Sequence, residues 1–363
     1  MTRQPPSKSR LLLALSGGVD SAVAAWRAQQ QGYEVEAVYM KNWINEENVF
    51  GNCPWMQDIE DAQAVAEHLN IPFKVLNYMD AYRERVVAYL VDGYSRGLTP
   101  NPDVMCNREM KFGVLLDYAL ENGFDAVGTG HYCRRSDDAD EPWLLEGVDK
   151  NKDQSYFLCM IRPDQLQHAR FPAGDLQKPE LRKLAGEIGL PNASKKDSQG
   201  ICFIGEVKIN DFLEKFIPEK PGPIVNMDGD VLGEHKGLHR YTLGQRRGIG
   251  IPSNSDNEFY VVVAKRMESN ELVVAFESAR ANPIWHDQIT LHQISWLTAS
   301  PPESVTDLQV KVRYRDPRVP ARWEPNPQGG GTLIFKDPQR ALASGQICAI
   351  YDGERVLGGG AYV

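Results

Sequence analysis

Apolar runs typical of buried strands alternate with helical patterns over the first 135 residues. Leu11–Leu15, Val35–Met40 and Phe73–Leu76 are short apolar runs, and Ala22–Gln30 and Met56–Leu69 between them have helical spacing. Further helices are expected around Ala81–Val91 and Met110–Leu120, and a fourth strand at Asp125–Gly128. Strands separated by helices predict βαβ units, a mostly parallel sheet and hence an α/β fold. Such sheets bind ligands at the carboxyl ends of their strands, near the point where the strand order reverses.

The sequence changes character after about residue 205. Proline and glycine become more frequent, and short β-rich runs replace the helical patterns. These runs are Phe259–Ala264, Glu271–Phe276, Leu308–Tyr314, Thr332–Phe335 and Ile347–Tyr351. Short strands separated by turn signals predict small antiparallel barrels or sandwiches. We therefore expect three domains, over residues 1–205, 206–285 and 286–363.

Composition excludes several classes of protein. Apolar residues make up 42% and charged residues 25% of the 363 residues, which is ordinary for a globular chain. The run Leu11–Leu15 is far shorter than the ~20 residues of a membrane span, and a secretory signal needs a longer apolar core. Six cysteines without a CxxC pair, and no His/Cys cluster with zinc spacing, predict neither a disulfide scaffold nor a metal site. The expected compartment is the cytoplasm, with no membrane partner.

The net charge of −9 argues weakly against a nucleic-acid partner, because phosphate binding usually leaves a basic footprint. Two local stretches are nevertheless basic. His235–Arg247 contains no acidic residue, and Lys311–Arg322 contains only Asp316. The first stretch is a candidate patch for binding the backbone of a polyanion, through Lys236, His239, Arg240, Arg246 and Arg247. In the second stretch, strand alternation predicts an apolar inner face from Leu308 to Tyr314 and a basic outer face.

The hexapeptide SGGVDS (Ser16–Ser21) lies between the first predicted strand and the first predicted helix. Its glycines allow a tight turn and a close approach to a ligand, and the following helix directs its free N–H groups there. A Gly-Gly pair alone is more often a capped turn, and the Gly-Lys-Ser/Thr of a Walker A loop is absent. The full hexapeptide resembles the loop of the PP-loop ATP pyrophosphatases. That resemblance implies a site for the pyrophosphate of ATP on a Rossmann-like fold.

Two cysteines lie in contexts that suggest chemistry. Cys106 follows the rigid loop Asn101–Asp103 near the start of a predicted helix, where the helix dipole, Arg108 and Lys111 favour a thiolate. Cys202 lies in DSQGICFI, after two lysines. Each cysteine taken alone is more often an inert, buried side chain.

Six motifs together resemble the bacterial tRNA-specific 2-thiouridylases, and the match extends over most of the chain. They are SGGVDS, NPDVMCN, GTGHY, DKNKDQSYFL, DSQGICFIG and YTLGQRRGIG, with the ending LGGGAY. The resemblance implies a Rossmann-like PP-loop domain, a small central domain and a C-terminal antiparallel β-barrel. It also implies that ATP adenylates the C2 oxygen of the wobble uridine of tRNA, after which a cysteine persulfide transfers sulfur to C2 and AMP leaves.

The family's functional residues transfer to this chain position by position. Cys202 matches the persulfide carrier and Cys106 the second catalytic cysteine, which implies a disulfide between them for external reduction. Asp103 is a candidate for proton handling on the uracil, or else a turn aspartate that caps the helix. The positions matching ATP contacts are Ala14, Leu15, Ser16, Gly17, Gly18, Val19, Asp20, Ser21, Met40 and Gly130, with Mg²⁺ arriving on ATP. The positions matching tRNA contacts are Asn101, Pro102, Asp103, His131, Lys152, Asp153, Gln154, Arg313, Tyr314 and Gln346.

Several of these residues have a simpler reading. His131 is equally compatible with a loop histidine whose hydrogen bonds are satisfied, and KNKDQ with a solvated loop. Another PP-loop enzyme, such as a different RNA thiolase or an amidating ligase, is the nearest alternative, although the sequence has neither a cluster-binding CxxC nor a resemblance to a glutaminase. A tRNA-binding module without catalysis is a further alternative. The family also implies lysine, glutamate and glutamine tRNAs and a sulfur-donor protein, either a cysteine desulfurase or a relay.

Overall fold

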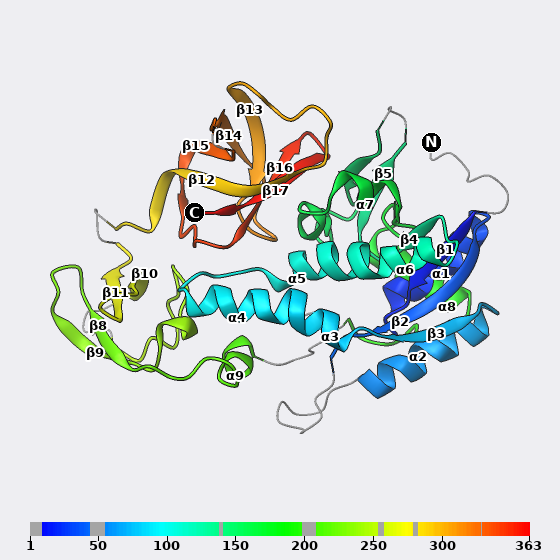
Figure 1. Cartoon of the computed structure of the whole chain (residues 1–363), viewed down its shortest axis with the longest axis horizontal. Helices are drawn as coiled ribbons and strands as arrows, with labels where there is room; N and C mark the ends of the chain where they lie inside the picture. The colour runs from blue at the N-terminus through cyan, green and yellow to red at the C-terminus, as the bar shows by residue number, and fades with distance from the viewer. Residues whose placement is uncertain are drawn as a thin grey trace.

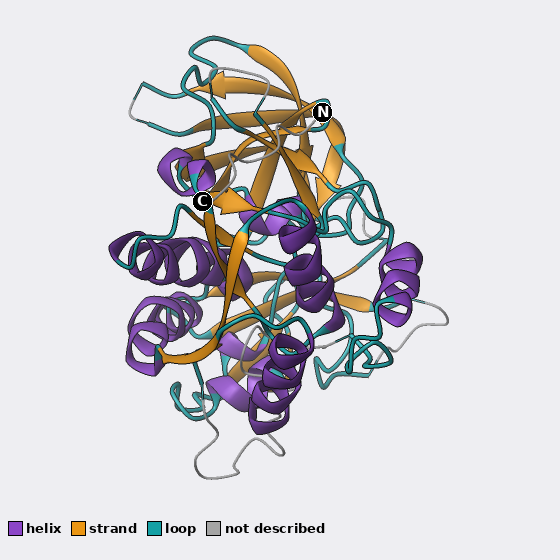
Figure 2. Ribbon diagram, turned by 90° about the vertical axis from the view of Figure 1, so that its right-hand side faces the viewer, coloured by secondary structure: helices purple, strands orange, loops and turns teal. Residues whose placement is uncertain are grey.

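The computed structural model describes residues 9–43, 55–137, 141–197, 208–252, 258–278, 282–327 and 329–363. Cys202 therefore lies outside the described residues. Three lobes follow one another along the chain: a first lobe with a parallel sheet, a small central lobe of strands, and a β-barrel (Figure 1). Viewed from the side, the strands of the barrel gather at the top and most helices lie below them (Figure 2).

The first lobe is built on a five-stranded parallel sheet in the order β3-β2-β1-β4-β7. Its strands are β1 (Arg10–Ala14), β2 (Glu34–Lys41), β3 (Phe73–Asn77), β4 (Ala126–Gly128) and β7 (Ala169–Arg170). Both faces of β1 are buried, which explains its unbroken run of leucines. The order reverses between β1 and β4, so a ligand site is expected at their carboxyl ends. The α/β fold and the first four strands predicted from the sequence are confirmed.

Helices cover both faces of this sheet. On one face α1 (Val19–Gln30), α2 (Trp55–His68) and α8 (Lys178–Glu187) pack against Leu11 and Leu13. The other face is covered by two long helices, each of which changes its winding along its length. The segments of these helices are α3 (Met79–Tyr82), η1 (Arg83–Val87) and α4 (Ala88–Ser95), then α5 (Pro102–Met105), η2 (Cys106–Val114) and α6 (Leu115–Glu121).

The segments η1 and η2 are π-helical, with hydrogen bonds that reach five residues back rather than four. At the end of η2 the N–H of Leu115 donates to the carbonyl of Met110. The carbonyl of Arg108 in this segment also accepts a hydrogen bond from Nε2 of Gln165, 2.8 Å away. Gln165 is fully buried and lies on α7 (Pro163–Gln167). A side chain from a neighbouring helix thus contacts the backbone of η2.

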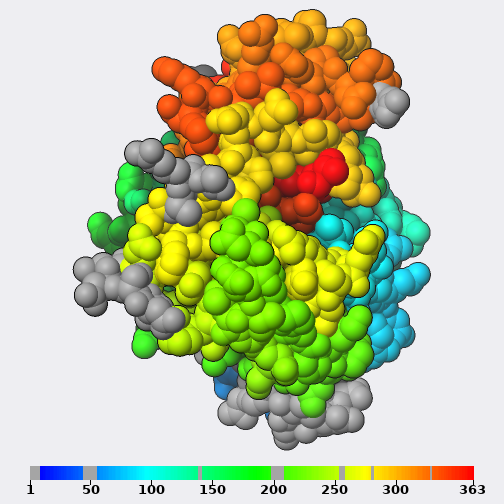
Figure 3. Space-filling model, turned by 90° about the vertical axis from the view of Figure 1, so that its left-hand side faces the viewer, coloured from blue at the N-terminus to red at the C-terminus, as the bar shows by residue number. Residues whose placement is uncertain are grey.

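The central lobe consists of a four-stranded sheet and two short helices. The elements are α9 (Ile209–Leu213), β8 (Gly222–Val225), β9 (Val231–His235), η4 (Leu238–Arg240), β10 (Tyr260–Arg266) and β11 (Glu271–Phe276). Its sheet order is β10-β11-β8-β9. Lys265 donates to the carbonyl of Gly97 at 3.0 Å, just before the Asn101 loop, and burial lowers the pKa of Lys265 to about 8. The central lobe therefore lies against the first lobe and below the barrel, as its green-to-yellow surface shows in Figure 3.

Six strands of the C-terminal region close into an antiparallel barrel, because β12 pairs with both β15 and β17. They are β12 (Trp285–Trp296), β13 (Thr306–Lys311), β14 (Val319–Pro325), β15 (Gly331–Arg340), β16 (Ile347–Asp352) and β17 (Arg355–Tyr362). Trp323, Val310 and Leu333 fill the interior. The predicted C-terminal antiparallel β-barrel is confirmed.

A hairpin of the first lobe extends the sheet of the barrel. It consists of β5 (Cys133–Ser136) and β6 (Trp143–Glu146), and β6 pairs with β17 through Leu144 and Val356. Leu144 and Cys133 also belong to the same buried cluster as Leu12 of the parallel sheet and Tyr351 of the barrel. The first lobe and the barrel consequently share one continuous hydrophobic core.

Buried charges reinforce this junction. Lys311 of β13 donates to Asp153 at 2.7 Å and pairs with Glu146 at 2.9 Å. The side chains of the two carboxylates are only 1% and 3% exposed. Burial alone would raise the pKa of Glu146, but Lys311 and Lys150 outweigh it and hold that pKa below its usual range.

The apolar face predicted for the strand containing Leu308 is confirmed, since Leu308, Val310 and Val312 are buried, but the predicted basic face differs from the structure in two respects. β13 ends at Lys311, whose ammonium is held between buried carboxylates. Arg313 turns back and donates to the carbonyls of Arg340 (2.5 Å) and Ala341. The alternation of apolar and basic residues along a strand cannot show that carboxylates from distant parts of the chain lie next to Lys311.

Replacing Lys311 with methionine is expected to lower the free energy of unfolding by about 3 kcal/mol, because it leaves the buried carboxylate of Asp153 without its cation. Urea unfolding followed by fluorescence measures the effect. Lys336→Met is the control, since Lys336 is exposed on β15 of the same barrel. Equal stabilities of the two variants would show that the buried pairs do not stabilise the junction.

The contribution of Glu354 to stability is expected to depend on pH. Hydrogen bonds from Lys150 and then Arg134 lower the pKa of Glu354 to about 2, below the ~4.3 of an unfolded chain. The stabilisation from this carboxylate is therefore present above about pH 4.3 and disappears as the pH falls towards 2. The difference in urea midpoint between wild type and Glu354→Gln should accordingly be larger at pH 6 than at pH 3. A difference independent of pH would contradict this assignment.

Candidate functional site

A pocket of about 170 Å³ lies at the carboxyl ends of β1, β2 and β4, where the strand order reverses. The residues lining it are Ala14, Leu15, Ser16, Asp20, Ser21, Val38, Met40, Lys111, Thr129, Gly130, His131 and Gln154. Seven of the ten positions predicted for ATP are among them: Ala14, Leu15, Ser16, Asp20, Ser21, Met40 and Gly130. Gly17, Gly18 and Val19 belong to the same loop but do not line the pocket.

The SGGVDS loop is held in a shape that exposes the start of α1. Gly17 has φ +75°, and a Cβ there would lie 2.4 Å from the carbonyl oxygen of Asp58. Nδ2 of Asn192 donates to the carbonyl of Gly17 at 2.9 Å. The N-cap residue of α1 is Gly18, which has no side chain to cap the helix. Free N–H groups at the positive end of a helix suit a phosphate or another anion.

Gly130 lines the pocket on the same side as the SGGVDS loop. A Cβ at this position would lie 2.6 Å from the backbone nitrogen of Ser21. Only glycine allows the GTGHY segment after β4 to approach α1 so closely. The two glycine-containing motifs, more than 100 residues apart in sequence, thus meet at the site.

Asp20 is held by partners that sequence reasoning did not identify. Its carboxylate accepts hydrogen bonds from the Tyr132 hydroxyl at 2.8 Å and from Lys178 at 2.6 Å. Lys178 also pairs with Asp197 at 2.7 Å. Burial alone would raise the pKa of Asp197, but Lys178 and Lys152 hold it well below its usual range. Asp20 therefore fixes the loop within an ion-pair network.

His131 is buried and neutral. Burial and then the charge of Lys111 hold the pKa of His131 well below its usual range. Nζ of Lys111 lies 3.5 Å from Nε2 of His131, and Nδ1 lies 2.8 Å from Oγ1 of Thr129. Because an ammonium can only donate, Nε2 accepts and Nδ1 carries the proton. Lys111 and Thr129 were missed as pocket residues, since a lysine in a helix and a threonine after a strand carry no distinctive signal.

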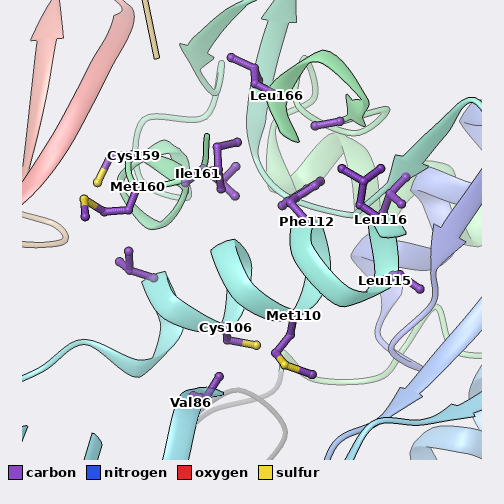
Figure 4. Close-up of a cluster of buried hydrophobic side chains, with 14 of the residues drawn as sticks. Val86, Cys106, Met110, Phe112, Leu115, Leu116, Cys159, Met160, Ile161 and Leu166 are labelled. Carbon is purple, nitrogen blue, oxygen red and sulfur yellow. The ribbon is translucent and has the colours of Figure 1, made fainter. Parts of the chain in front are cut away.

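The Asn101 loop starts the helix that contains Cys106. Asn101 caps this helix, because its Oδ1 accepts from the N–H groups of Asp103 and Val104 at 3.1 Å. The helix begins at Pro102, so Cys106 lies four residues inside it, at the start of η2. The thiol is fully buried, beside Met110 and Val86 (Figure 4). Asn101, rather than Asp103, provides the cap that the sequence had offered as one role for Asp103.

The KNKDQ segment is not the solvated loop that composition suggested. Lys152 pairs with Asp197 at 2.9 Å. Asp153 is buried and accepts from Gly147 N, Ser155 Oγ and Lys311. Gln154 lines the pocket and accepts from the backbone N–H of Tyr132 at 3.0 Å. A direct contact between RNA and Asp153 is therefore unfavourable, because its carboxylate is already satisfied inside the fold.

The predicted tRNA positions of the barrel lie beside the Asn101 loop. The ring of Tyr314 packs on Phe157 with centroids 4.2 Å apart, and Phe157 belongs to η3 (Ser155–Leu158). The carbonyl of Phe157 accepts from Asn107, one residue after Cys106. The N–H of Thr99 donates to the carbonyl of Ser344, two residues before Gln346. The structure thus brings Tyr314 and the segment before Gln346 close to the Asn101 loop and its helix.

The basic stretch of the central lobe is partly paired with acidic side chains, and its role in binding a polyanion stays a prediction. Arg240 pairs with Glu214 and Glu219, and Arg246 with Glu277. His239 is buried, and burial followed by Arg240 lowers its pKa. Lys236 and Arg247 are exposed.

The described residues hold no group of three or more His, Cys, Asp and Glu side chains placed to bind a metal ion. None of their helices has the length and apolar character required to cross a membrane.

The fold and the pocket define a Rossmann-like nucleotide-binding class of protein, and comparison with known proteins narrows it. The family models that match are described as a tRNA methyl transferase HUP domain (residues 9–206), a tRNA methyl transferase PRC-barrel domain (210–276) and an aminomethyltransferase β-barrel domain (286–361). The tRNA-specific 2-thiouridylase MnmA of Akkermansia muciniphila is 52% identical over 97% of this chain and 98% of its own. The protein of the same name from Aeromonas salmonicida is 43% identical over 98% and 96%. The chain belongs to the tRNA-specific 2-thiouridylase family.

Similarity to solved structures is weaker. A 4-thiouridine synthetase in complex with RNA and ATP is 22% identical, over 58% of this chain and 50% of that one, with a TM-score of 0.38. This score is too low to support a conclusion.

Gly130→Ala is expected to weaken binding of a non-hydrolysable ATP analogue at least tenfold, because the added methyl group would force the GTGHY segment away from α1. Titration calorimetry measures this affinity. Gly186→Ala is the matched control: Gly186 is exposed on α8, with no atom within 4 Å of an added Cβ. Unchanged affinity of Gly130→Ala would show that the pocket is not the nucleotide site.

Proposed function

We propose that this chain is an ATP-dependent tRNA 2-thiouridylase that acts on the wobble uridine. The observation that supports this best is the arrangement of the pocket. The SGGVDS loop and Gly130 form one side, and Lys111 of η2, the helical segment that begins at Cys106, forms another. The helical segment η2 thus contains both Cys106 and a residue that lines the proposed nucleotide site.

ATP fits the chemistry of the pocket. The uncapped N-terminus of α1 and the close approach of Gly130 provide N–H groups and space for phosphates, and Val38 and Met40 provide an apolar wall for a base. ATP would make the uracil C2 oxygen a good leaving group by joining it to AMP, with release of pyrophosphate. Mg²⁺ would arrive with ATP and neutralise charge on the phosphates.

Sulfur transfer follows from thiol chemistry in the proposed scheme. A persulfide on Cys202 attacks C2 of the adenylated uridine, and AMP leaves with the electron pair of the C2–O bond. The thiolate of Cys106 then attacks the sulfur that remains on Cys202, which breaks the S–S bond to the transferred sulfur and leaves 2-thiouridine and a Cys106–Cys202 disulfide. An external thiol reduces that disulfide, and a sulfur-donor protein reloads Cys202. Because Cys106 is fully buried, its thiol must become accessible during this cycle.

The RNA-facing part of the proposal combines the Asn101 loop with Tyr314, Arg313 and Gln346 of the barrel. Oε1 of Gln346 is buried and has no hydrogen-bond partner among the described residues. An unpaired buried acceptor costs about 1–3 kcal/mol and is consistent with a group kept for a ligand. His131 and Gln154 would lie between the nucleotide and the RNA. We propose Asp103 for proton handling on the flipped-out uracil, since recognition of RNA favours unstacked loop bases.

The remaining assignments are part of the same proposal. Residues 1–205 would form the catalytic domain, 206–285 a central domain that contacts tRNA, and 286–363 the barrel domain. The substrates would be lysine, glutamate and glutamine tRNAs, and the protein would act in the cytoplasm.

The test is nucleoside mass analysis of unmodified glutamate tRNA after incubation with the protein, Mg-ATP and a sulfur source. We expect 2-thiouridine with wild type, none without ATP, and a loss of at least 100-fold with Cys106→Ser or Cys202→Ser, because both thiols take part in group transfer. Cys348→Ser is the control, since Cys348 is buried in the barrel core. Full activity of Cys202→Ser would exclude the persulfide scheme. ATP cleavage without thiolation would favour another PP-loop reaction, and binding without either would favour a module that has lost catalysis.

A further inference from the structure

Lys111 is the one basic side chain lining the pocket, apart from the neutral His131, among the residues that the structure describes. The negative charge of Asp20, also in the wall, is already balanced by Lys178. The pocket therefore combines the N-terminus of α1 with an ammonium group that comes from a different element. Negative charge that develops in this pocket during a reaction would be stabilised by both the N-terminus of α1 and the ammonium of Lys111.

The winding of η2 sets the direction of Lys111 relative to Cys106. In an α-helix successive residues are about 100° apart, so residues five apart point about 140° away from each other. In a π-helix the hydrogen bond joins residues five apart, which places them roughly one above the other on one face. Since η2 begins at Cys106, Lys111 lies one π turn further along. An α-helical winding would separate these two side chains.

Gln165 of α7 contacts the backbone of the π-helical segment η2. Its Nε2 donates to the carbonyl of Arg108 at 2.8 Å, and its Oε1 accepts from the N–H of Arg162 at 2.9 Å. Gln165 does not line the pocket. Its amide satisfies a carbonyl in the middle of η2, between Cys106 and Lys111.

The ammonium of Lys111 is also held from the side of β4. Nε2 of His131 faces Nζ of Lys111, and Thr129 fixes the tautomer that leaves this nitrogen free to accept. A protonated imidazole would repel the ammonium instead. The buried, neutral state of His131 therefore favours an ordered Lys111.

We infer that Lys111 is a catalytic residue of the proposed thiolation, and that Gln165 is a positioning residue that acts through it. The inference rests on the proposed function. The ammonium of Lys111 contacts the α-phosphate and the uracil C2 oxygen bonded to it. When sulfur attacks C2, the electron pair of the C2–O bond passes to AMP, and Lys111 stabilises the charge that develops there. Lys111 forms no covalent bond in this step and transfers no proton.

The first experiment compares Lys111→Met, Lys111→Arg and wild type in single-turnover formation of AMP and 2-thiouridine at saturating Mg-ATP. Wild-type activity is the prerequisite, and its absence would overturn the proposed function itself. Lys111→Met should slow the reaction about 100-fold or more, as loss of a donor to developing charge does, with little change in affinity for an ATP analogue. Lys111→Arg should recover part of the rate, since arginine keeps the charge. Lys183→Met is the control, because Lys183 is 78% exposed on α8.

An active wild type with an unimpaired Lys111→Met would overturn the role of Lys111 and leave the proposed function standing. A parallel loss of analogue affinity and rate would show that Lys111 serves binding alone and would also overturn the inference. Circular dichroism verifies the fold of each variant. Lys111→Gln replaces Lys111→Met if the methionine variant does not fold.

A double-mutant cycle tests the positioning role. Gln165→Met should slow the wild type at least tenfold, yet slow Lys111→Met no further, because both changes would remove the same interaction. A structural defect unrelated to Lys111 predicts that the two losses multiply. Multiplying losses would therefore overturn the role assigned to Gln165.

Discussion

The pairing of β6 with β17 determines how the parts of this molecule are placed. Through it, a hairpin of the α/β lobe becomes part of the barrel sheet, and the two share one buried cluster. Lys311 of β13 pairs with Glu146 at the end of β6 and with Asp153 in the loop that follows β6. Gln154, one residue after Asp153, lines the pocket. The barrel is thus connected to the pocket by a short path of buried contacts, and Tyr314 is held beside the helix that contains Cys106.

In the pocket His131 is neutral and the charge of Asp20 is balanced by Lys178. Two sources of positive potential therefore dominate its electrostatics. The N-terminus of α1 supplies one through the backbone, and Lys111 supplies the other through a side chain. Asp20 contributes to shape rather than charge, because Tyr132 and Lys178 engage it. A low local dielectric strengthens such interactions, so small changes in direction at Lys111 have large effects.

Much of the fold could be predicted from the sequence, because it follows from periodicity and from local loop chemistry. Periodicity was sufficient for the α/β class, the first four strands and the β-rich C-terminal region, whereas the strand order was not predicted. The resemblance alone implied that Ser16–Ser21 and Gly130 share a site. The features that were missed depend on partners far along the chain. Lys311 was expected on the outer face of its strand, although its carboxylate partner Asp153 lies 158 residues away. Lys111 and the π winding of η2 were not identified, because neither a helical lysine nor a helix that hydrogen-bonds five residues back has a distinctive pattern. The role of Cys202 stays a prediction.

The hairpin that joins the lobes also affects how the chain folds during synthesis. β6 ends at Glu146 and its partner β17 begins at Arg355, so about 209 residues separate the two paired edges. At the ~5–20 residues per second of translation, β6 stays without its partner for roughly 10–40 s. An unpaired, partly apolar strand edge is a template for association with other chains. The nascent α/β lobe is therefore exposed to misassembly until the C-terminal strand emerges, and a chaperone that covers β6 would be of most use in that interval.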